Sequence, residues 1–98
     1  IEWQTDEKPS LTYWGNAIAG EVGEACNVLK KLERERMGMK GSRATVDDLG
    51  KELADAKIYI ALLEADLGIN GDRYVGIKFN ETSEKYGFKT RMEVPGEG

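Results

Sequence analysis

The chain has 98 residues, of which 40% are hydrophobic and 33% charged, and it carries a net charge of −4. This length provides for one domain with a single core. No apolar run approaches the roughly 20 residues that span a bilayer, and residues 1–10 lack the apolar stretch of a signal peptide. We therefore expect a soluble cytoplasmic protein with no membrane partner. The negative charge argues against a nucleic-acid partner, which would require a basic face.

The sequence contains no histidine and one cysteine, Cys26. The lack of an imidazole excludes Ser/His and Cys/His nucleophilic sites and histidine-containing zinc or di-iron centres. A bound metal would need carboxylate ligands, which suit magnesium, manganese or calcium. One cysteine forms no internal disulfide and fits a reducing compartment.

A first helix is predicted to begin near Ser10, a plausible N-cap, and to fade around Arg36. Its apolar side chains recur at steps of three and four residues, which is one face of an amphipathic helix. They are Leu11, Trp14, Ile18, Val22, Ala25, Leu29 and Leu32.

A glycine-bearing loop over residues 37–43 separates this helix from a second one, and its length permits an antiparallel hairpin. Thr45 is the predicted N-cap, Asp47 and Asp48 place negative charge at the first turn, and Gly68 ends the helix. The apolar stripe of this helix is Val46, Leu49, Leu53, Ala56, Ile60, Leu63 and Leu67.

A third helix is expected after residues 70–72, running through Val75 and Phe79 to Gly87, a left-handed C-cap. The whole chain, 1–98, forms one domain with its core over about residues 10–88. The polar tail over residues 89–98 is expected to be flexible or to dock on a partner subunit.

The second helix is apolar on more than one side. At about 100° per residue, Ile58 and Leu62 lie away from the stripe that contains Leu53 and Ile60. A homodimer that completes a four-helix bundle would cover both sides, and a short extra helix or the tail is the alternative. The predicted fold is therefore all-α, an antiparallel helical hairpin plus a third helix, with a four-helix-bundle-like core completed by homo-oligomerisation.

Two pairs of carboxylates, Glu21 with Glu24 and Glu52 with Asp55, are each spaced three residues apart on the first two helices. Such spacing places both members of a pair on one side of a helix, and antiparallel packing would bring all four acids into one cleft. Without a cation they would repel each other and raise one another's pKa. The pattern therefore favours a divalent-metal site, with ordinary solvated acids as the alternative.

Glycines lie beside the first acid pair. Gly20 and Gly23 each cost about 1 kcal/mol relative to alanine within a helix. Close approach of a ligand or of a neighbouring helix would explain them, as would tight helix packing alone.

The runs Ala19-Gly20-Glu21-Val22-Gly23-Glu24-Ala25 and Glu52-Leu53-Ala54-Asp55 resemble the signature of the MazG-like branch of the all-α nucleoside triphosphate pyrophosphohydrolases, relatives of the dimeric dUTPases. That signature is Glu-x-x-Glu, a variable spacer, then Glu-x-x-Asp. The segments Lys78-Phe79-Asn80-Glu81-Thr82-Ser83 and Tyr86-Gly87-Phe88 also resemble the third helix of MazG-like proteins. The resemblance covers roughly residues 14–88.

The resemblance implies an enzyme that hydrolyses a nucleoside triphosphate, in the first place a dNTP, between the α- and β-phosphates, in nucleotide-pool cleansing. It implies a homodimer or homotetramer and Mg²⁺ as cofactor, with Mn²⁺ as a substitute. The implied catalytic residues, which are also the metal ligands, are Glu21, Glu24, Glu52 and Asp55. Which acid activates water stays open.

Four residues are candidates for binding the substrate. By resemblance, Tyr59 would contact the sugar or base, and Lys78 and Asn80 would contact phosphate or sugar. Trp14 is placed to stack on a base, but its position on the apolar stripe favours a core role. For Tyr59, too, a core role is the alternative.

Two other functions fit the same sequence. The first is phosphoribosyl-ATP pyrophosphohydrolase, which shares the helical acid pattern. The second is a non-catalytic helical module that dimerises or binds a nucleotide.

Overall fold

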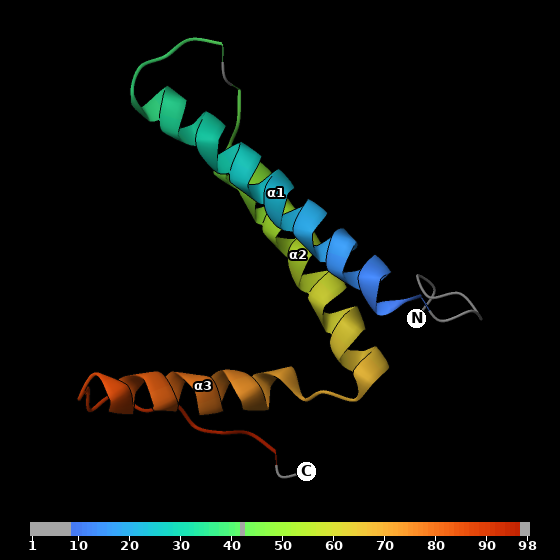
Figure 1. The fold of residues 1–98 in the computed structure, drawn as a ribbon. Helices are drawn as coiled ribbons and strands as arrows, with labels where there is room; N and C mark the ends of the chain where they lie inside the picture. Colours follow the sequence, from blue (N-terminus) through green and yellow to red (C-terminus); the bar gives the residue numbers. More distant parts are fainter. Residues whose placement is uncertain (1–8, 42, 97–98) are drawn as a thin grey trace. The chain divides into compact units, whose positions relative to one another are not determined.

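The structure is a computed structural model, and it describes residues 9–41 and 43–96. The described residues form three α-helices and no strand: α1 (Leu11–Arg36), α2 (Val46–Leu67) and α3 (Gly71–Lys85) (Figure 1). The all-helical prediction is confirmed. No helix in this described part is long and apolar enough to cross a membrane. The chain divides into two compact units, one ending at Ile60 and the other beginning at Ala61.

α1 and α2 begin at the N-caps that the sequence predicts, Ser10 and Thr45, and α3 begins close to its predicted start. The Ser10 hydroxyl accepts a hydrogen bond from the Tyr13 amide at 3.0 Å. Thr45 and Asp48 bond reciprocally, each side chain accepting from the other's amide at 3.0 and 2.9 Å. The Asn70 side chain caps α3, so α3 begins at Gly71, slightly earlier than expected. These bonds satisfy amides that lack partners within the helices.

Each helix ends at a glycine of positive φ, at Gly38, Gly68 and Gly87. Around each glycine, two backbone bonds close the last turn, for example from the Gly87 amide to the Glu84 carbonyl and from the Phe88 amide to the Ser83 carbonyl. This is the Schellman arrangement, which needs a residue in the left-handed region. The predicted ends at Gly68 and Gly87 are therefore confirmed.

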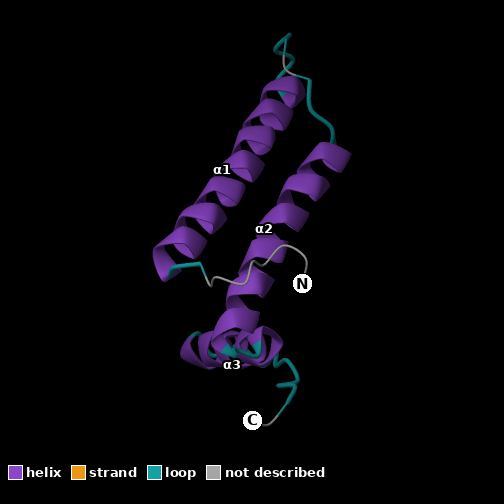
Figure 2. Ribbon diagram, turned by 90° about the vertical axis from the view of Figure 1, so that its right-hand side faces the viewer, coloured by secondary structure: helices purple, strands orange, loops and turns teal. Residues whose placement is uncertain are grey.

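Over the first unit, α1 and α2 lie side by side and antiparallel (Figures 1 and 2). Trp14 is 2% exposed and contacts the ring of Tyr59, with centroids 6.4 Å apart. Ala25 and Ala56 are also buried, and these small side chains allow the helices to approach. The glutamate Glu35 accepts a bond from the Ala44 amide at 3.2 Å, which ties the end of the interhelical loop to α1. The predicted hairpin is present.

The apolar residues of α2 differ in burial, also where they share one side of the helix. Leu62 is 3% exposed, whereas Leu53, Ile58 and Ile60 are 44%, 37% and 40% exposed. The chain itself thus buries one of the two residues that the sequence places away from the stripe. Part of the stripe remains exposed to solvent.

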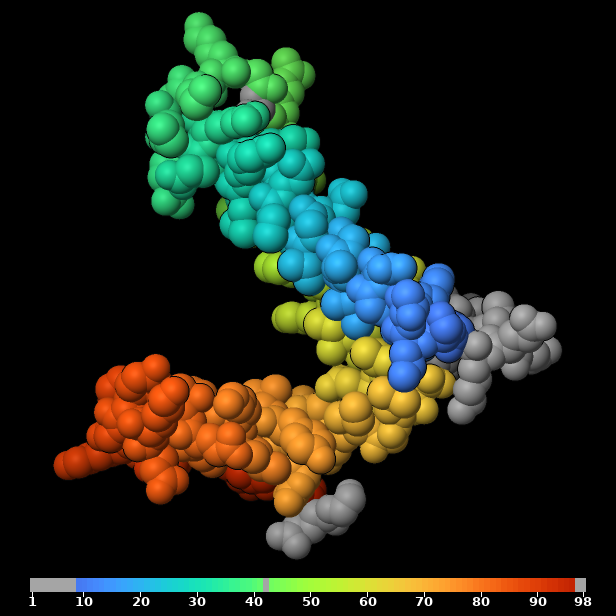
Figure 3. Space-filling model, viewed as in Figure 1, coloured from blue at the N-terminus to red at the C-terminus, as the bar shows by residue number. Residues whose placement is uncertain are grey.

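In the second unit, residues 92–96 run back along α3 (Figures 1 and 3). We name them the C-terminal strap. The Asn80 amide donates to the Met92 carbonyl at 3.0 Å, and the Met92 amide donates to the Asn80 side chain at 2.8 Å. Arg73 donates to the Gly96 carbonyl. In the structure of the single chain, the strap therefore docks on its own helix. Residues 97–98 lie outside the described part.

The strap requires a glycine at position 76. A Cβ atom there would lie 2.8 Å from the Glu93 carbonyl oxygen, whereas a Cβ at Gly50 would meet open space. We predict that Gly76→Ala destabilises the protein by about 1–3 kcal/mol through overpacking. The control Gly50→Ala should stabilise it by about 0.5–1 kcal/mol. Urea unfolding measures both, and hydrogen exchange at Met92 should accelerate only in the first variant. A Gly76→Ala protein with an unchanged Met92 exchange rate would contradict this account.

Candidate metal centre

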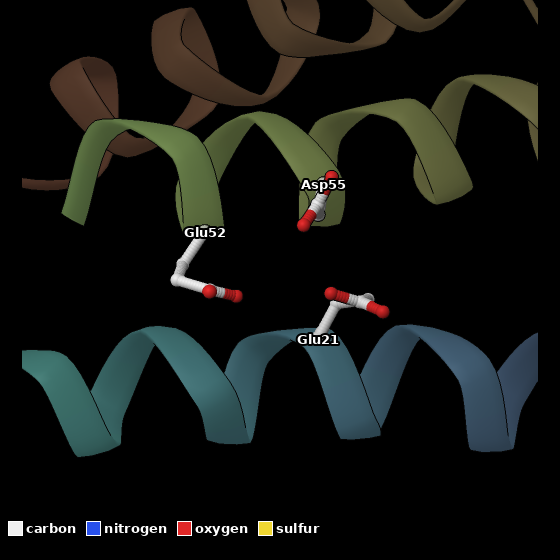
Figure 4. Close-up of side chains that lie close together, drawn as sticks. All are labelled: Glu21, Glu52 and Asp55. Atoms are coloured by element: carbon white, nitrogen blue, oxygen red, sulfur yellow. The ribbon is translucent and has the colours of Figure 1, made fainter. Parts of the chain in front are cut away.

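Three carboxylates meet between α1 and α2 within the first unit. Glu21 comes from the middle of α1, and Glu52 and Asp55 come from one side of α2, a turn apart; Figure 4 shows them facing one another. One oxygen from each lies within 4.8 Å of the others. We call this group the acidic triad. The i, i+3 spacing on α2 and the antiparallel pairing together produce it.

The donor set of the acidic triad fits a hard divalent cation. Magnesium and calcium bind oxygen ligands at about 2.0–2.6 Å, so opposite ligands of one ion lie about 4–5 Å apart. The separation of up to 4.8 Å in the triad is of this size. Glu21 and Glu52 are half-buried, which limits competition from bulk water.

The electrostatics of Glu21 reflect its neighbours. Partial burial, followed by the charges of Asp55, Glu52 and Glu24, raises the pKa of Glu21 above its ordinary value of 4.5. Among the described residues, the ion pairs involve other groups: Lys51, the lysine next to Glu52, pairs with Asp47 at 3.3 Å. Within the described part of the chain, the triad therefore concentrates negative charge without an ion pair to a basic side chain, and a cation would remove the repulsion.

The fourth predicted ligand, Glu24, is not part of the triad. It is exposed on α1, and its carboxylate is near enough to contribute to the raised pKa of Glu21. The structure thus brings together three of the four acids and places the fourth beside them.

The aromatic candidates Trp14 and Tyr59 contact each other in the hairpin. Trp14 is 2% exposed, so its ring has no free face for a base, and this favours the core role considered from the sequence. Among the described residues its Nε1 atom is buried without a hydrogen-bond partner. Tyr59 is half-buried and lies one turn beyond Asp55, adjacent to the triad.

The other two candidates, Lys78 and Asn80, belong to the second unit. The Lys78 ammonium pairs with Glu81 at 3.8 Å, and both side chains are exposed. Lys78 also lines a shallow pocket with Glu64, Tyr74 and Phe79. Asn80 uses its amide to hold Met92 of the strap. Sequence reasoning missed both the strap contact and this pocket, although the spacing of Tyr74, Lys78 and Thr82 places them on one helix face.

Among the described residues, the glycines near the triad have no packing partner. A Cβ atom at Gly20 or Gly23 would meet nothing within 4 Å. Tight packing against the described part of the chain therefore does not explain them, whereas approach of a ligand or of another molecule would.

Comparisons with protein-family models, with curated proteins and with solved structures found no match. The assignment of a function therefore relies on the sequence motifs and on the geometry of the triad.

We predict that Mg²⁺ or Mn²⁺ raises the thermal unfolding temperature of the protein, since binding to the folded state stabilises it. Glu21→Gln should unfold at a higher temperature than the wild type in EDTA, because one repelling charge is gone, and should lose the response to metal. Glu33→Gln, an exposed acid elsewhere on α1, is the control and should respond like the wild type. Scanning calorimetry measures all three, and a full metal response in Glu21→Gln would argue against the triad as the binding site.

We also predict a pH dependence from the raised pKa of Glu21. Between pH 4.5 and the raised pKa, and in EDTA, Glu21 is protonated in the folded state but ionised in the unfolded state. The free energy of unfolding should therefore fall as the pH rises through this range. Metal affinity should rise over the same range, since the ion needs the carboxylate form. The free energy of unfolding in urea, measured for wild type and for Glu21→Gln at each pH, isolates the contribution of Glu21. If the difference between the two proteins did not change with pH, the prediction would be wrong.

Proposed function

We propose that this protein is a cytoplasmic, metal-dependent nucleoside triphosphate pyrophosphohydrolase of the MazG-like kind. It converts a nucleoside triphosphate, in the first place a dNTP, and water into the monophosphate and pyrophosphate, and thereby cleanses the nucleotide pool. The observation that carries the proposal is the convergence of Glu21, Glu52 and Asp55, which belong to the two acid motifs of the resemblance, within 4.8 Å.

The chemistry of such a reaction matches the residues present. Hydrolysis of a phosphoanhydride needs in-line positioning of water and neutralisation of phosphate charge, and it needs no covalent nucleophile. Bound Mg²⁺ would supply that neutralisation. The carboxylates of Glu21, Glu52 and Asp55 would hold the ion, with Glu24 beside them. One of these acids would orient the attacking water or accept its proton while the bond between the α-phosphorus and the bridging oxygen breaks.

We propose that Tyr59 and Lys78 contact the substrate. Tyr59 is half-buried one turn from Asp55, and the Lys78 ammonium is exposed and suits phosphate as a point charge. Trp14 is buried in the core and Asn80 binds the strap, so both residues have structural roles. That engagement is the observation in favour of the second candidate function, a non-catalytic helical module.

The oligomeric form belongs to the same proposal. A homodimer or homotetramer would complete a four-helix-bundle core around the hairpin. The exposed side chains of Leu53 and Ile60 on α2 support it, since such surface is normally covered in a stable helical protein.

The experiment is pyrophosphate release from a panel of canonical and modified dNTPs and NTPs, with phosphoribosyl-ATP included, in the presence of Mg²⁺, Mn²⁺ or EDTA. We expect metal-dependent release that Glu52→Gln lowers by about 10²-fold or more, the size typical for loss of a group that stabilises transition-state charge. The control Glu33→Gln should retain the wild-type rate. Turnover of phosphoribosyl-ATP alone would assign the histidine-pathway activity, and no turnover by the folded protein would favour the non-catalytic module.

A further inference from the structure

The pocket in the second unit is large enough for a small molecule. Its volume is about 540 Å³, which is in the range of ligand sites. Its lining comes from the end of α2 and from positions of α3 that recur at steps of three and four residues, which places them on one side of that helix. The lining includes Glu64, Gly71, Tyr74, Val75, Lys78 and Phe79.

The strap leaves this pocket open, because the two lie on opposite sides of α3. Gly76 and Asn80 face the strap. At about 100° per residue, Lys78 lies about 160° around the helix from each of them. Gly71 lies only about 20° from Lys78 by the same arithmetic, so these two residues belong to one face.

The carboxylate of Glu64 closes one end of the pocket. It lies against the first residue of α3, since a Cβ atom at Gly71 would collide with it. Glu64 is half-buried, and within the described part of the chain its carboxylate forms no hydrogen bond and no ion pair. A carboxylate accepts hydrogen bonds and donates none, so this end of the pocket offers an acceptor to a ligand that carries N–H groups.

The ammonium of Lys78 belongs to the other end. Lys78 follows Gly71 by seven residues, which is about 10 Å along the helix. Its side chain is 78% exposed, and its ion pair with Glu81 is long, at 3.8 Å. An exposed pair of this length holds a lysine weakly. Lys78 is therefore available to an anionic group of a ligand.

The surface between the two ends is apolar and aromatic. Tyr74, Val75 and Phe79 are 59%, 57% and 39% exposed. Aromatic rings on an open surface provide stacking partners for a planar heterocycle, and such stacking tolerates many ring types. The pocket thus combines an acceptor, a stacking surface and a cation in this order along α3.

The ligand that matches this order is a planar ring with N–H donors at one end and an anionic group at the other. A nucleotide has this form, because the outer edge of its base and its phosphate lie at opposite ends of the molecule. Cytosine and adenine carry an exocyclic amino group that donates, whereas thymine has a carbonyl acceptor at the corresponding position. A carboxylate pairs with the amino group and leaves the carbonyl without a donor.

We propose that this pocket binds the base of a nucleotide and that Glu64 selects bases that carry an exocyclic amino group. The sugar and phosphate extend along α3 toward Lys78. The inference rests on the proposed function for the nucleotide as substrate, and it adds the class of base that is preferred. Pairing of a carboxylate with an amino group gives about 5- to 100-fold discrimination against the wrong base.

The test titrates the wild-type protein with CMP, AMP, UMP and TMP in EDTA, so that neither metal binding nor hydrolysis takes part. NMR chemical shifts of the Val75 methyl groups report on the pocket. We expect saturable shifts with all four nucleotides, and CMP and AMP should bind about 5- to 100-fold more tightly than UMP and TMP. This comparison needs no variant.

Three variants then assign the preference to its residue. Glu64→Gln has a side chain of similar size that both donates and accepts, so the preference should disappear. Lys78→Gln should weaken binding of all four nucleotides and retain the preference, because it removes only the partner of the phosphate. Glu84→Gln, at an exposed acid of α3 outside the pocket lining, is the control and should bind like the wild type. Circular dichroism verifies that each variant is folded.

Unchanged Val75 shifts, equal affinity for the four nucleotides, or a preference that persists in Glu64→Gln would overturn the base site. Pyrophosphate release with metal separates this outcome from failure of the proposed function. A protein that prefers CMP and AMP but hydrolyses no triphosphate has the base site without the proposed activity. A protein that hydrolyses dCTP and TTP with equal kcat/KM, before and after Glu64→Gln, has the activity without the base site.

Discussion

The constraint on which this hairpin depends is the placement of three carboxylates in its helix–helix interface. Glu21, Glu52 and Asp55 lie within 4.8 Å in the interface that also buries Ala25 and Ala56. Apolar side chains at those three positions would stabilise the pair, whereas partial burial, followed by repulsion from neighbouring carboxylates, raises the pKa of Glu21. A local arrangement that costs stability is typical of a functional site, and a bound cation converts the repulsion into attraction.

The rest of the hairpin compensates for this loss. Trp14 fills the interface beyond the triad and contacts Tyr59, while the alanines allow the helices to approach at the level of the acids. The buried apolar side chains are few for a domain of this size, which is the usual difficulty of small chains.

The second unit has its own means of stabilisation. α3 is polar and contains a glycine, Gly76, where a Cβ atom would lie 2.8 Å from the Glu93 carbonyl oxygen. The strap occupies that space, and Asn80 fixes it through two bonds to Met92. This arrangement gives a short helix a covered face without a large core. It also explains why asparagine, a weak helix former, stands in the middle of α3.

By itself the sequence determined the helix boundaries at Ser10, Thr45, Gly68 and Gly87, since these residues act through local hydrogen bonds and backbone angles. It also determined the pairing of acids, because i, i+3 spacing is a local property. Tertiary structure decided that Glu24 lies outside the triad, since that depends on the rotation of α1 against α2, and it buried Trp14, for which the sequence already favoured a core role. Tertiary structure also decided that the strap docks on Asn80. Asn80 and Met92 are twelve positions apart and only Asn80 lies in a helix, so no helical periodicity in the sequence predicts their contact.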